Sequence, residues 1–251
     1  MAEITGFWVH PNRYRALLFD VDGTLAETEG EGHLPSFNEA FRQLGIDWDW
    51  SCADYGRLLR VAGGLERMHH HALSIGQGGW AKSAEGQQLL AQAHRLKNDL
   101  YAKSLAAGVI KPRPGVVQLI KSALAEGMEW AVVTTTSTSN WNALWEGCLS
   151  PELDRPPAIA ICGEDVSRKK PDPEAYQLAV ERLRLSVGEC LAVEDSPNGL
   201  EAARSAGLDC VVVRSLFFAE ALFNGALADL KEPHELRIGV PGEFQQTACR
   251  Q

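Results

Sequence analysis

The sequence predicts an α/β protein, a parallel sheet core interrupted by an all-helical insert. Three apolar runs, at 15–24, 129–137 and 189–199, each end in polar residues capable of chemistry. Runs that are apolar on both faces are typical of buried parallel strands. Helical periods separate the runs, and this alternation indicates right-handed crossovers between parallel strands.

Further elements complete this core. Two shorter apolar runs, at 209–213 and 158–162, predict a fourth and a fifth strand. The residues from 232 onward are polar without a clear period and predict an irregular tail. The helical periods between the strands lie at 116–126, 140–149, 173–185 and 199–206.

The stretch from 27 to 108 differs from the rest because it contains no convincing strand. Its helical periods lie at 37–44, 55–72 and 84–105, and the Gly-rich segment 74–80 predicts a loop. We therefore expect a Rossmann-like core domain, built from 1–26 and 109–251, with a helical domain at 27–108 inserted after the first strand.

The composition limits the classes of function that this chain can have. The chain has 251 residues, 24 Lys+Arg against 33 Asp+Glu, a net charge of −9 and 45% apolar residues, as expected for a folded protein with one large core or two smaller ones. The acidic balance argues against a nucleic-acid partner. No apolar run reaches the roughly 18 residues of a membrane span, and the N-terminus does not resemble a signal peptide. We expect a monomer without a membrane partner.

The six cysteines include no C-x-x-C pair, and several lie inside apolar runs. This pattern predicts free thiols in a reducing compartment rather than disulfides or a zinc site. The expected location is the cytoplasm, or the plastid stroma if a transit peptide has been removed.

Carboxylates follow two of the predicted strands. Asp20 and Asp22 follow the first, and Glu194 and Asp195 end the third. Because parallel strands present their carboxyl ends at one edge, these side chains should converge. A lone D-x-D is equally well a turn or a cap, but a second acidic pair weakens that interpretation. Four carboxylates without clustered His or Cys favour Mg²⁺.

The same edge should also hold a phosphate. Mg²⁺ is usually bound by one or two carboxylates together with a substrate phosphate. Thr134 and its neighbour Thr135 supply hydroxyls at the end of the second strand, and Lys170 in SRKKPDP supplies a positive charge. Read alone, the threonines are a strand edge and the lysine is a solvated residue before a proline turn.

Together these segments resemble a known family. DVDGT, the strand ending in Thr134, KPDP from Lys170 and EDSPNGLEAA stand in the order of the four motifs of the haloacid dehalogenase superfamily. The resemblance implies that Asp20 is a nucleophile forming an aspartyl-phosphate and that Asp22 is the general acid and base. It further implies that Thr134 hydrogen-bonds the phosphoryl group, and that Lys170 neutralises this group and holds Asp20. Mg²⁺ would be bound by Asp20, the backbone carbonyl of Asp22 and Asp195, with Glu194 beside them.

A closer resemblance involves the insert, which matches the cap of that superfamily. ETEGEGH, FNEAF, GG-x-ER, KNDLY, RPGV and TTTS are similar to segments of CbbY-type phosphatases, which hydrolyse xylulose 1,5-bisphosphate. KNDLY also resembles the cap of β-phosphoglucomutase. The resemblance implies substrate contacts for Glu29, His33, Arg67 and Lys97.

Two departures from the CbbY pattern concern the substrate. Leu34 stands where that pattern has Arg, and Leu65 where it has Lys. Since a second phosphate favours basic partners, we expect weaker discrimination for a bisphosphate. The remaining basic groups, Arg67, Lys97 or Arg113, could suffice, or the substrate could be a less charged sugar phosphate.

The predicted function is a Mg²⁺-dependent phosphatase acting on a small sugar phosphate, with xylulose 1,5-bisphosphate as one candidate. A β-phosphoglucomutase-like phosphomutase is the first alternative, although Thr24 stands where those enzymes carry Val. A catalytically weak binding or regulatory protein is the second. The residues 69–71, three consecutive histidines, are expected at the cap surface, and Trp48, Trp50 and Trp80 are expected to pack the cap.

Overall fold

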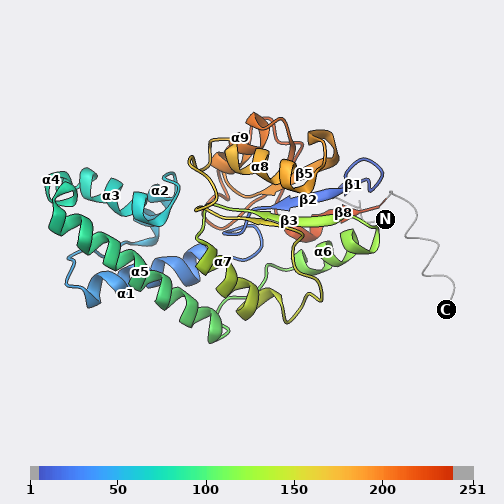
Figure 1. Ribbon diagram of the computed structural model, residues 1–251. Helices are drawn as coiled ribbons and strands as arrows, with labels where there is room; N and C mark the ends of the chain where they lie inside the picture. Colours follow the sequence, from blue (N-terminus) through green and yellow to red (C-terminus); the bar gives the residue numbers. More distant parts are fainter. Residues whose placement is uncertain (1–5, 240–251) are drawn as a thin grey trace.

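The computed structural model describes residues 6–239 and contains a six-stranded sheet with helices on both faces (Figure 1). Its strand order is β4-β3-β2-β5-β6-β7, and each neighbouring pair is parallel. The predicted α/β class is therefore confirmed. The strands are β2 (Ala16–Phe19), β3 (Glu129–Val133), β4 (Ala160–Ile161), β5 (Cys190–Glu194), β6 (Asp209–Val213) and β7 (Ala228–Leu230).

Strand β2 lies in the middle of the sheet and is buried on both faces. Leu17 and Phe19 belong to one apolar cluster, whereas Ala16 and Leu18 belong to another. This division follows from the alternation of side chains along a strand. It explains why the sequence of a central parallel strand is apolar throughout.

Four helices cover the sheet. Helices α6 and α7 contribute to the cluster that contains Phe19, and α8 and α9 contribute to the cluster that contains Leu18. In Figure 1, α8 and α9 lie above the sheet and α6 below it. The bounds are α6 (Val116–Ala125), α7 (Thr138–Leu144), α8 (Glu174–Leu183) and α9 (Pro197–Ser205).

The insert is helical, as predicted, and lies at the left of Figure 1. It begins with a π-helical turn (Glu29–His33) and has an apolar cluster of its own, rich in aromatic rings, to which Trp48 and Trp50 contribute and against which Trp80 packs. Its helices are α1 (Leu34–Gln43), α2 (Cys52–Leu58), α3 (Gly64–Ser74), α4 (Gly78–Lys82) and α5 (Ala84–Ala106).

Two expectations for the insert were wrong. The helix predicted at 55–72 is divided into α2 and α3, and Gly63 precedes α3 with a φ of 95°, a conformation that favours glycine. The loop predicted at 74–80 contains the start of α4. The first error arises because an apolar period continues across a short break in the backbone, and the second because Gly78 and Gly79, read as loop residues, begin a short helix.

The C-terminal region is more regular than predicted. Residues from 232 onward were expected to be irregular, but β8 (Leu236–Ile238) pairs in parallel with β1 (Phe7–Val9) to form a second, two-stranded sheet. Strand β7 was also not predicted. The part of the predicted tail at 240–251 lies outside the described residues.

The segments that enter and leave the insert lie side by side. Ala26 forms an antiparallel bridge with Pro112, and the Arg113 amide donates to the Leu25 carbonyl at 2.9 Å. The buried Arg113 guanidinium also donates to the carbonyls of Gly23, Val213 and Arg214, so it ties this junction to the end of β6. This pairing supports the proposed division of the chain into a core domain, built from 1–26 and 109–251, and an inserted domain at 27–108.

Two predictions from the composition concern membrane-spanning helices and the state of the cysteines. Within residues 6–239, no helix is both long enough and apolar enough to cross a membrane. The described cysteines are free thiols, and all except Cys52 are buried: Cys52, Cys148, Cys162, Cys190 and Cys210. Cys249 lies outside the described residues.

Candidate active site

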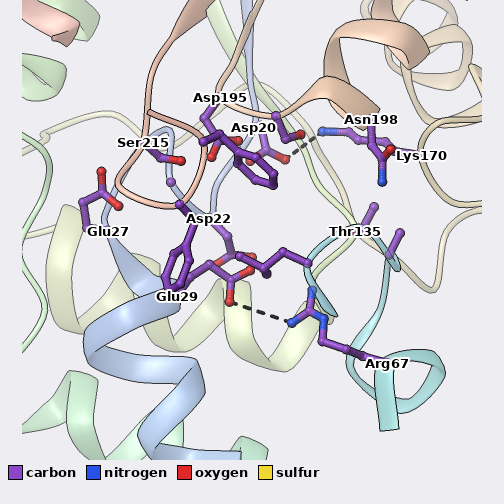
Figure 2. Close-up of a pocket in the computed structure, with 16 residues that line it drawn as sticks. Asp20, Asp22, Glu27, Glu29, Arg67, Thr135, Lys170, Asp195, Asn198 and Ser215 are labelled. Atoms are coloured by element: carbon purple, nitrogen blue, oxygen red, sulfur yellow. Dashed lines mark hydrogen bonds and ion pairs between the residues drawn. The ribbon is translucent and has the colours of Figure 1, made fainter. Parts of the chain in front are cut away.

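Several of the polar residues expected to converge line one cavity at the carboxyl edge of the sheet: Asp20, Asp22, Thr135, Lys170 and Asp195 (Figure 2). Phe19 is in register with Val132 and Val193, so the residues after these positions share one level. The Asp20 amide donates to the Val193 carbonyl at 3.0 Å, which extends the ladder by one residue. Asp20 therefore emerges between the ends of β3 and β5.

Lys170 reaches this edge from the loop before α8. Its Nζ donates to Asp20 Oδ1 at 2.7 Å, to the Val133 carbonyl at 2.7 Å and to Glu194 Oε1 at 2.6 Å. Burial would lower the pKa of Lys170, but Asp20 and Glu194 outweigh that effect and raise it. The amine thus stays charged, and its three N–H groups are occupied within the chain.

Three buried carboxylates crowd together beside this lysine. Oxygens of Asp20, Glu194 and Asp195 all lie within 4.8 Å of one another. Burial raises the pKa of Asp20 to about 8, with Glu194 and Asp22 adding to the increase and Lys170 opposing it. Burial, Asp20 and Glu194 raise the pKa of Asp195 well above its ordinary value. Hard oxygen donors with excess negative charge fit a divalent cation such as Mg²⁺.

Glycines make room for the carboxylates of this cluster. Gly23 has a φ of 89°, and a Cβ at that position would lie 2.2 Å from Asp195 Oδ2. A Cβ at Gly199 would lie 1.9 Å from Glu194 Oε2. The backbone therefore approaches two of the carboxylates more closely than any other residue type would allow.

The Asp22 carboxylate is not part of the acidic cluster. Its Oδ1 accepts a hydrogen bond from the Thr28 hydroxyl and lies 3.0 Å from His33 Nε2. Burial would raise the pKa of Asp22, but His33, Thr28 and Lys97 outweigh that effect and lower it to about 2. The side chain faces the insert as an ionised group. Only its backbone carbonyl is left for the metal contact that the sequence implied.

The two threonines at the end of β3 have different environments. Thr134 is buried, and its Oγ1 accepts from the Thr136 amide at 3.1 Å. It lines neither of the two cavities that the described residues form around Asp22, whereas Thr135 lines both. The structure therefore places Thr135, rather than Thr134, where a ligand would lie.

Two of the cap residues form a buried network. The Tyr55 hydroxyl donates to Glu29 Oε2 and accepts from Arg67 Nη1 at 2.7 Å. Arg67 Nη1 also lies 3.9 Å from Glu29 Oε2 (Figure 2). These contacts hold the Arg67 guanidinium at the wall of both cavities.

Lys97 is the fourth cap residue that the sequence singled out, and it is buried. Its Nζ lies 4.9 Å from the centre of the Phe37 ring and 5.3 Å from that of Tyr101. Burial lowers the pKa of Lys97 to about 8, although Glu29 and Asp22 oppose the decrease. A buried ammonium that contacts aromatic faces is well placed to receive an anionic ligand.

Two adjoining cavities lie at the sheet edge and under the insert. One cavity of about 60 Å³ adjoins Asp20, Lys170 and Asp195. A second cavity of about 260 Å³ adjoins His33 and Lys97. The two cavities share lining residues: Asp22, Glu29, Arg67 and Thr135.

The two leucines that depart from the CbbY pattern have different surroundings. Leu65 lines the larger cavity, so its side chain borders the space for a ligand. Leu34 is 6% exposed and packs in the apolar cluster of the insert. Of the two, only Leu65 replaces a basic group directly at the cavity.

Contacts between the insert and the core enclose the site. Lys169 Nζ donates to Glu66 Oε1 at 2.6 Å, and Asn198 Nδ2 donates to the Arg60 carbonyl at 3.1 Å. The Phe217 ring, from the loop after β6, lies 5.8 Å from that of Tyr55. These contacts keep the insert closed over Asp20.

Sequence reasoning did not select several residues that shape the site. Thr28 and Tyr55 orient Asp22, Glu29 and Arg67, and Tyr176 donates to Glu194. Threonine and tyrosine are common at turns and in cores, so nothing in one sequence distinguishes these positions. Arg113, named as a basic candidate, is occupied by backbone carbonyls at the junction instead.

In this site a lysine holds an aspartate at the end of a parallel strand, beside further carboxylates and under a helical insert. This arrangement is typical of a class of enzymes that act on anionic esters. The model of the haloacid dehalogenase-like hydrolases matches residues 14–207, and the chain belongs to this family. It is an enzyme, a hydrolase of the phosphatase type.

Relatives refine this assignment. Protein CbbY of Cupriavidus necator is 42% identical over 230 residues, covering 91% of this chain and 87% of the relative. A solved mutant of CbbY from Rhodobacter sphaeroides in complex with xylulose-(1,5)bisphosphate is 38% identical, with a TM-score of 0.78 over 88% of this chain and 96% of that one. A β-phosphoglucomutase from Clostridium difficile, 17% identical, shares the fold with a TM-score of 0.70 over 93% and 96%.

Proposed function

We propose that the chain is a Mg²⁺-dependent phosphatase that hydrolyses a small sugar phosphate through an aspartyl-phosphate on Asp20. The observation that carries this proposal is the contact of Lys170 with Asp20 in a cavity that Arg67 also lines, next to a second cavity lined by Arg67 and Lys97. A reactive carboxylate and basic groups for a phosphorylated substrate thus border two adjoining cavities.

The acidic cluster is the proposed metal site. Asp20, Asp195 and the backbone carbonyl of Asp22 would hold Mg²⁺, which neutralises negative charge on a phosphoryl group when bound. Glu194 lies beside this site, where its Oε1 accepts from Lys170 and Tyr176 and so holds the lysine next to Asp20. A cation here also favours the ionised form of Asp20 that a nucleophile requires.

The proposed reaction has two steps. Asp20 attacks the phosphorus atom while the bond to the sugar oxygen breaks, and Asp22 gives its proton to that oxygen. Asp22 then accepts a proton from water, whose oxygen attacks phosphorus and releases Asp20. Without substrate, Asp22 is ionised because its pKa is lowered to about 2, so it must take up a proton before the first step; the negative charge of a bound phosphate raises this pKa and favours that uptake.

The insert provides the proposed substrate selectivity. The CbbY relative binds xylulose-(1,5)bisphosphate, a sugar with two phosphates. Lys97 and Arg67 are buried cations of the insert that line the larger cavity, and Leu65 adds apolar surface beside them. We infer a sugar phosphate whose distal part carries less charge than a second phosphate dianion, with xylulose 1,5-bisphosphate as a slower substrate.

The partners, the oligomeric state and the location of the protein are also proposals. The net charge of −9 disfavours a nucleic-acid partner. We propose a monomer that acts on a small molecule in the cytoplasm or the plastid stroma.

A substrate profile tests the proposed function. Purified protein is assayed with Mg²⁺ against sugar monophosphates, xylulose 1,5-bisphosphate and p-nitrophenyl phosphate, by release of inorganic phosphate. We expect kcat/KM for at least one sugar phosphate to exceed that for p-nitrophenyl phosphate. Phosphate moving between positions of glucose phosphates without release would instead establish a phosphomutase, and no turnover with any ester would refute the proposal.

A further inference from the structure

Tyr176 is a fully buried polar residue of helix α8 with no role in the steps described above. Its hydroxyl donates to Glu194 Oε1 at 2.7 Å. The ammonium of Lys170 also lies 5.0 Å from the centre of the Tyr176 ring. One side chain therefore contacts both the buried glutamate and the lysine that holds Asp20.

Glu194 is held on every side. Its Oε1 accepts from Lys170 and Tyr176, and its Oε2 lies 3.3 Å from the Asp195 amide and 3.4 Å from the Ser196 hydroxyl. The backbone at Gly199 also lies close to this carboxylate, since a Cβ there would lie 1.9 Å from Glu194 Oε2. The position of Lys170 consequently depends on how strongly this fixed carboxylate attracts it.

We propose that Tyr176 is a positioning residue that sets how Lys170 is shared between Glu194 and Asp20. The inference rests on the proposed phosphatase function. The hydroxyl donates to the same oxygen as Lys170 does, so it satisfies part of the negative charge of Glu194. More of the lysine's charge is then left for Asp20 and for a phosphoryl group bound there. The ring face keeps the ammonium centred between the two carboxylates.

The variant Tyr176→Phe removes the hydroxyl and keeps the ring. We expect kcat to fall about tenfold for sugar phosphates and for p-nitrophenyl phosphate alike, as is typical when a partner of a site residue is lost. KM should change less than twofold, because Tyr176 lines neither of the two substrate cavities formed by residues 6–239.

Tyr14→Phe is the matched control. The Tyr14 hydroxyl donates to Asp209 Oδ2 at 2.7 Å, the same kind of bond at the same length, at the start of β6 and thus at the opposite sheet edge. Each variant loses one hydrogen bond to a carboxylate, but only Tyr176→Phe should lose kcat. Equal kcat in wild type and Tyr176→Phe would overturn the inference, whereas an inactive wild type would refute the phosphatase proposal.

A readout without substrate separates positioning from general damage. The ¹⁵N resonance of the Lys170 ammonium is recorded in metal-free protein and assigned with Lys170→Met. We expect this resonance to shift in Tyr176→Phe and to stay unchanged in Tyr14→Phe. An unchanged resonance in Tyr176→Phe would show that the hydroxyl does not act on Lys170 and would overturn the inference.

Discussion

The Nζ atom of Lys170 lies 2.7 Å from Oδ1 of Asp20, although 150 positions separate the two residues in the sequence. The parallel sheet creates this contact by bringing the end of β2 next to the loop that precedes α8. Because the other N–H groups of Lys170 bind Val133 and Glu194, we propose that the lysine orients Asp20 and would act on a phosphoryl group through its charge. Four predictions concern residues of this site and of the insert.

The first prediction concerns Asp22 as the proton donor. Asp22→Asn should lower kcat for a sugar phosphate by about 10²–10⁴-fold, the range lost with a general acid or base. Hydrolysis of p-nitrophenyl phosphate should fall much less, because nitrophenolate leaves without a proton. Rates for both esters are compared in wild type and variant with saturating Mg²⁺. Equal losses would argue against Asp22 as the acid.

The second prediction concerns Lys97. Lys97→Met should raise KM for the preferred sugar phosphate about 10–100-fold, the effect of losing one hydrogen bond to a charged group. It should leave p-nitrophenyl phosphate hydrolysis nearly unchanged, since that ester makes little use of the larger cavity. Lys103→Met, from the same helix with no assigned role, is the control. A similar loss for both esters would show that Lys97 supports the fold rather than the substrate.

A third prediction follows from the pKa of Lys97, which burial lowers from 10.5 to about 8. The ammonium loses its charge as the pH rises through about 8, so KM for the sugar phosphate should increase above that pH. Between pH 8 and 10.5 the unfolded state binds more protons at this residue, so its contribution to stability rises with pH. The KM profile is measured in wild type and in Lys97→Met. An identical alkaline rise in both would assign it to another group.

The fourth prediction separates the two leucines. Leu65→Lys places a cation at the larger cavity, so kcat/KM for xylulose 1,5-bisphosphate should rise about tenfold relative to a monophosphate. Leu34→Arg places a charge in the apolar cluster of the insert and should lower the free energy of unfolding by about 2 kcal/mol. Kinetics and chemical denaturation measure the two effects. A bisphosphate preference gained only by Leu34→Arg would reverse this assignment.

The strands that carry the site were predictable because buried parallel strands leave continuous apolar runs in the sequence. The positions of Asp20 and Asp195 followed from the ends of those runs. In contrast, β1 and β8 are three residues long, and such short strands show no period. The strand order of the large sheet and the pairing of β1 with β8 depend on contacts between distant segments, which one sequence does not reveal.

The finer details of the site were less predictable for a different reason. Thr134 and Thr135 are chemically identical neighbours, and only the turn after β3 decides which one faces the cavity. Likewise, Leu34 and Leu65 are the same residue type, and only the folded helices α1 and α3 show that Leu34 packs in the apolar cluster whereas Leu65 lines the cavity. Tyr176 resembles any aromatic residue in a helix until its hydroxyl is found against Glu194.

In the proposed reaction, Asp20 carries the phosphoryl group during turnover. Wild-type protein and Asp20→Asn are mixed with Mg²⁺ and ³²P-labelled sugar phosphate, quenched in acid within milliseconds, and digested for mass spectrometry. The account predicts covalent label on the peptide that contains Asp20 in wild type, and neither label nor turnover in Asp20→Asn. Label on another residue, or turnover that persists in Asp20→Asn, would contradict it.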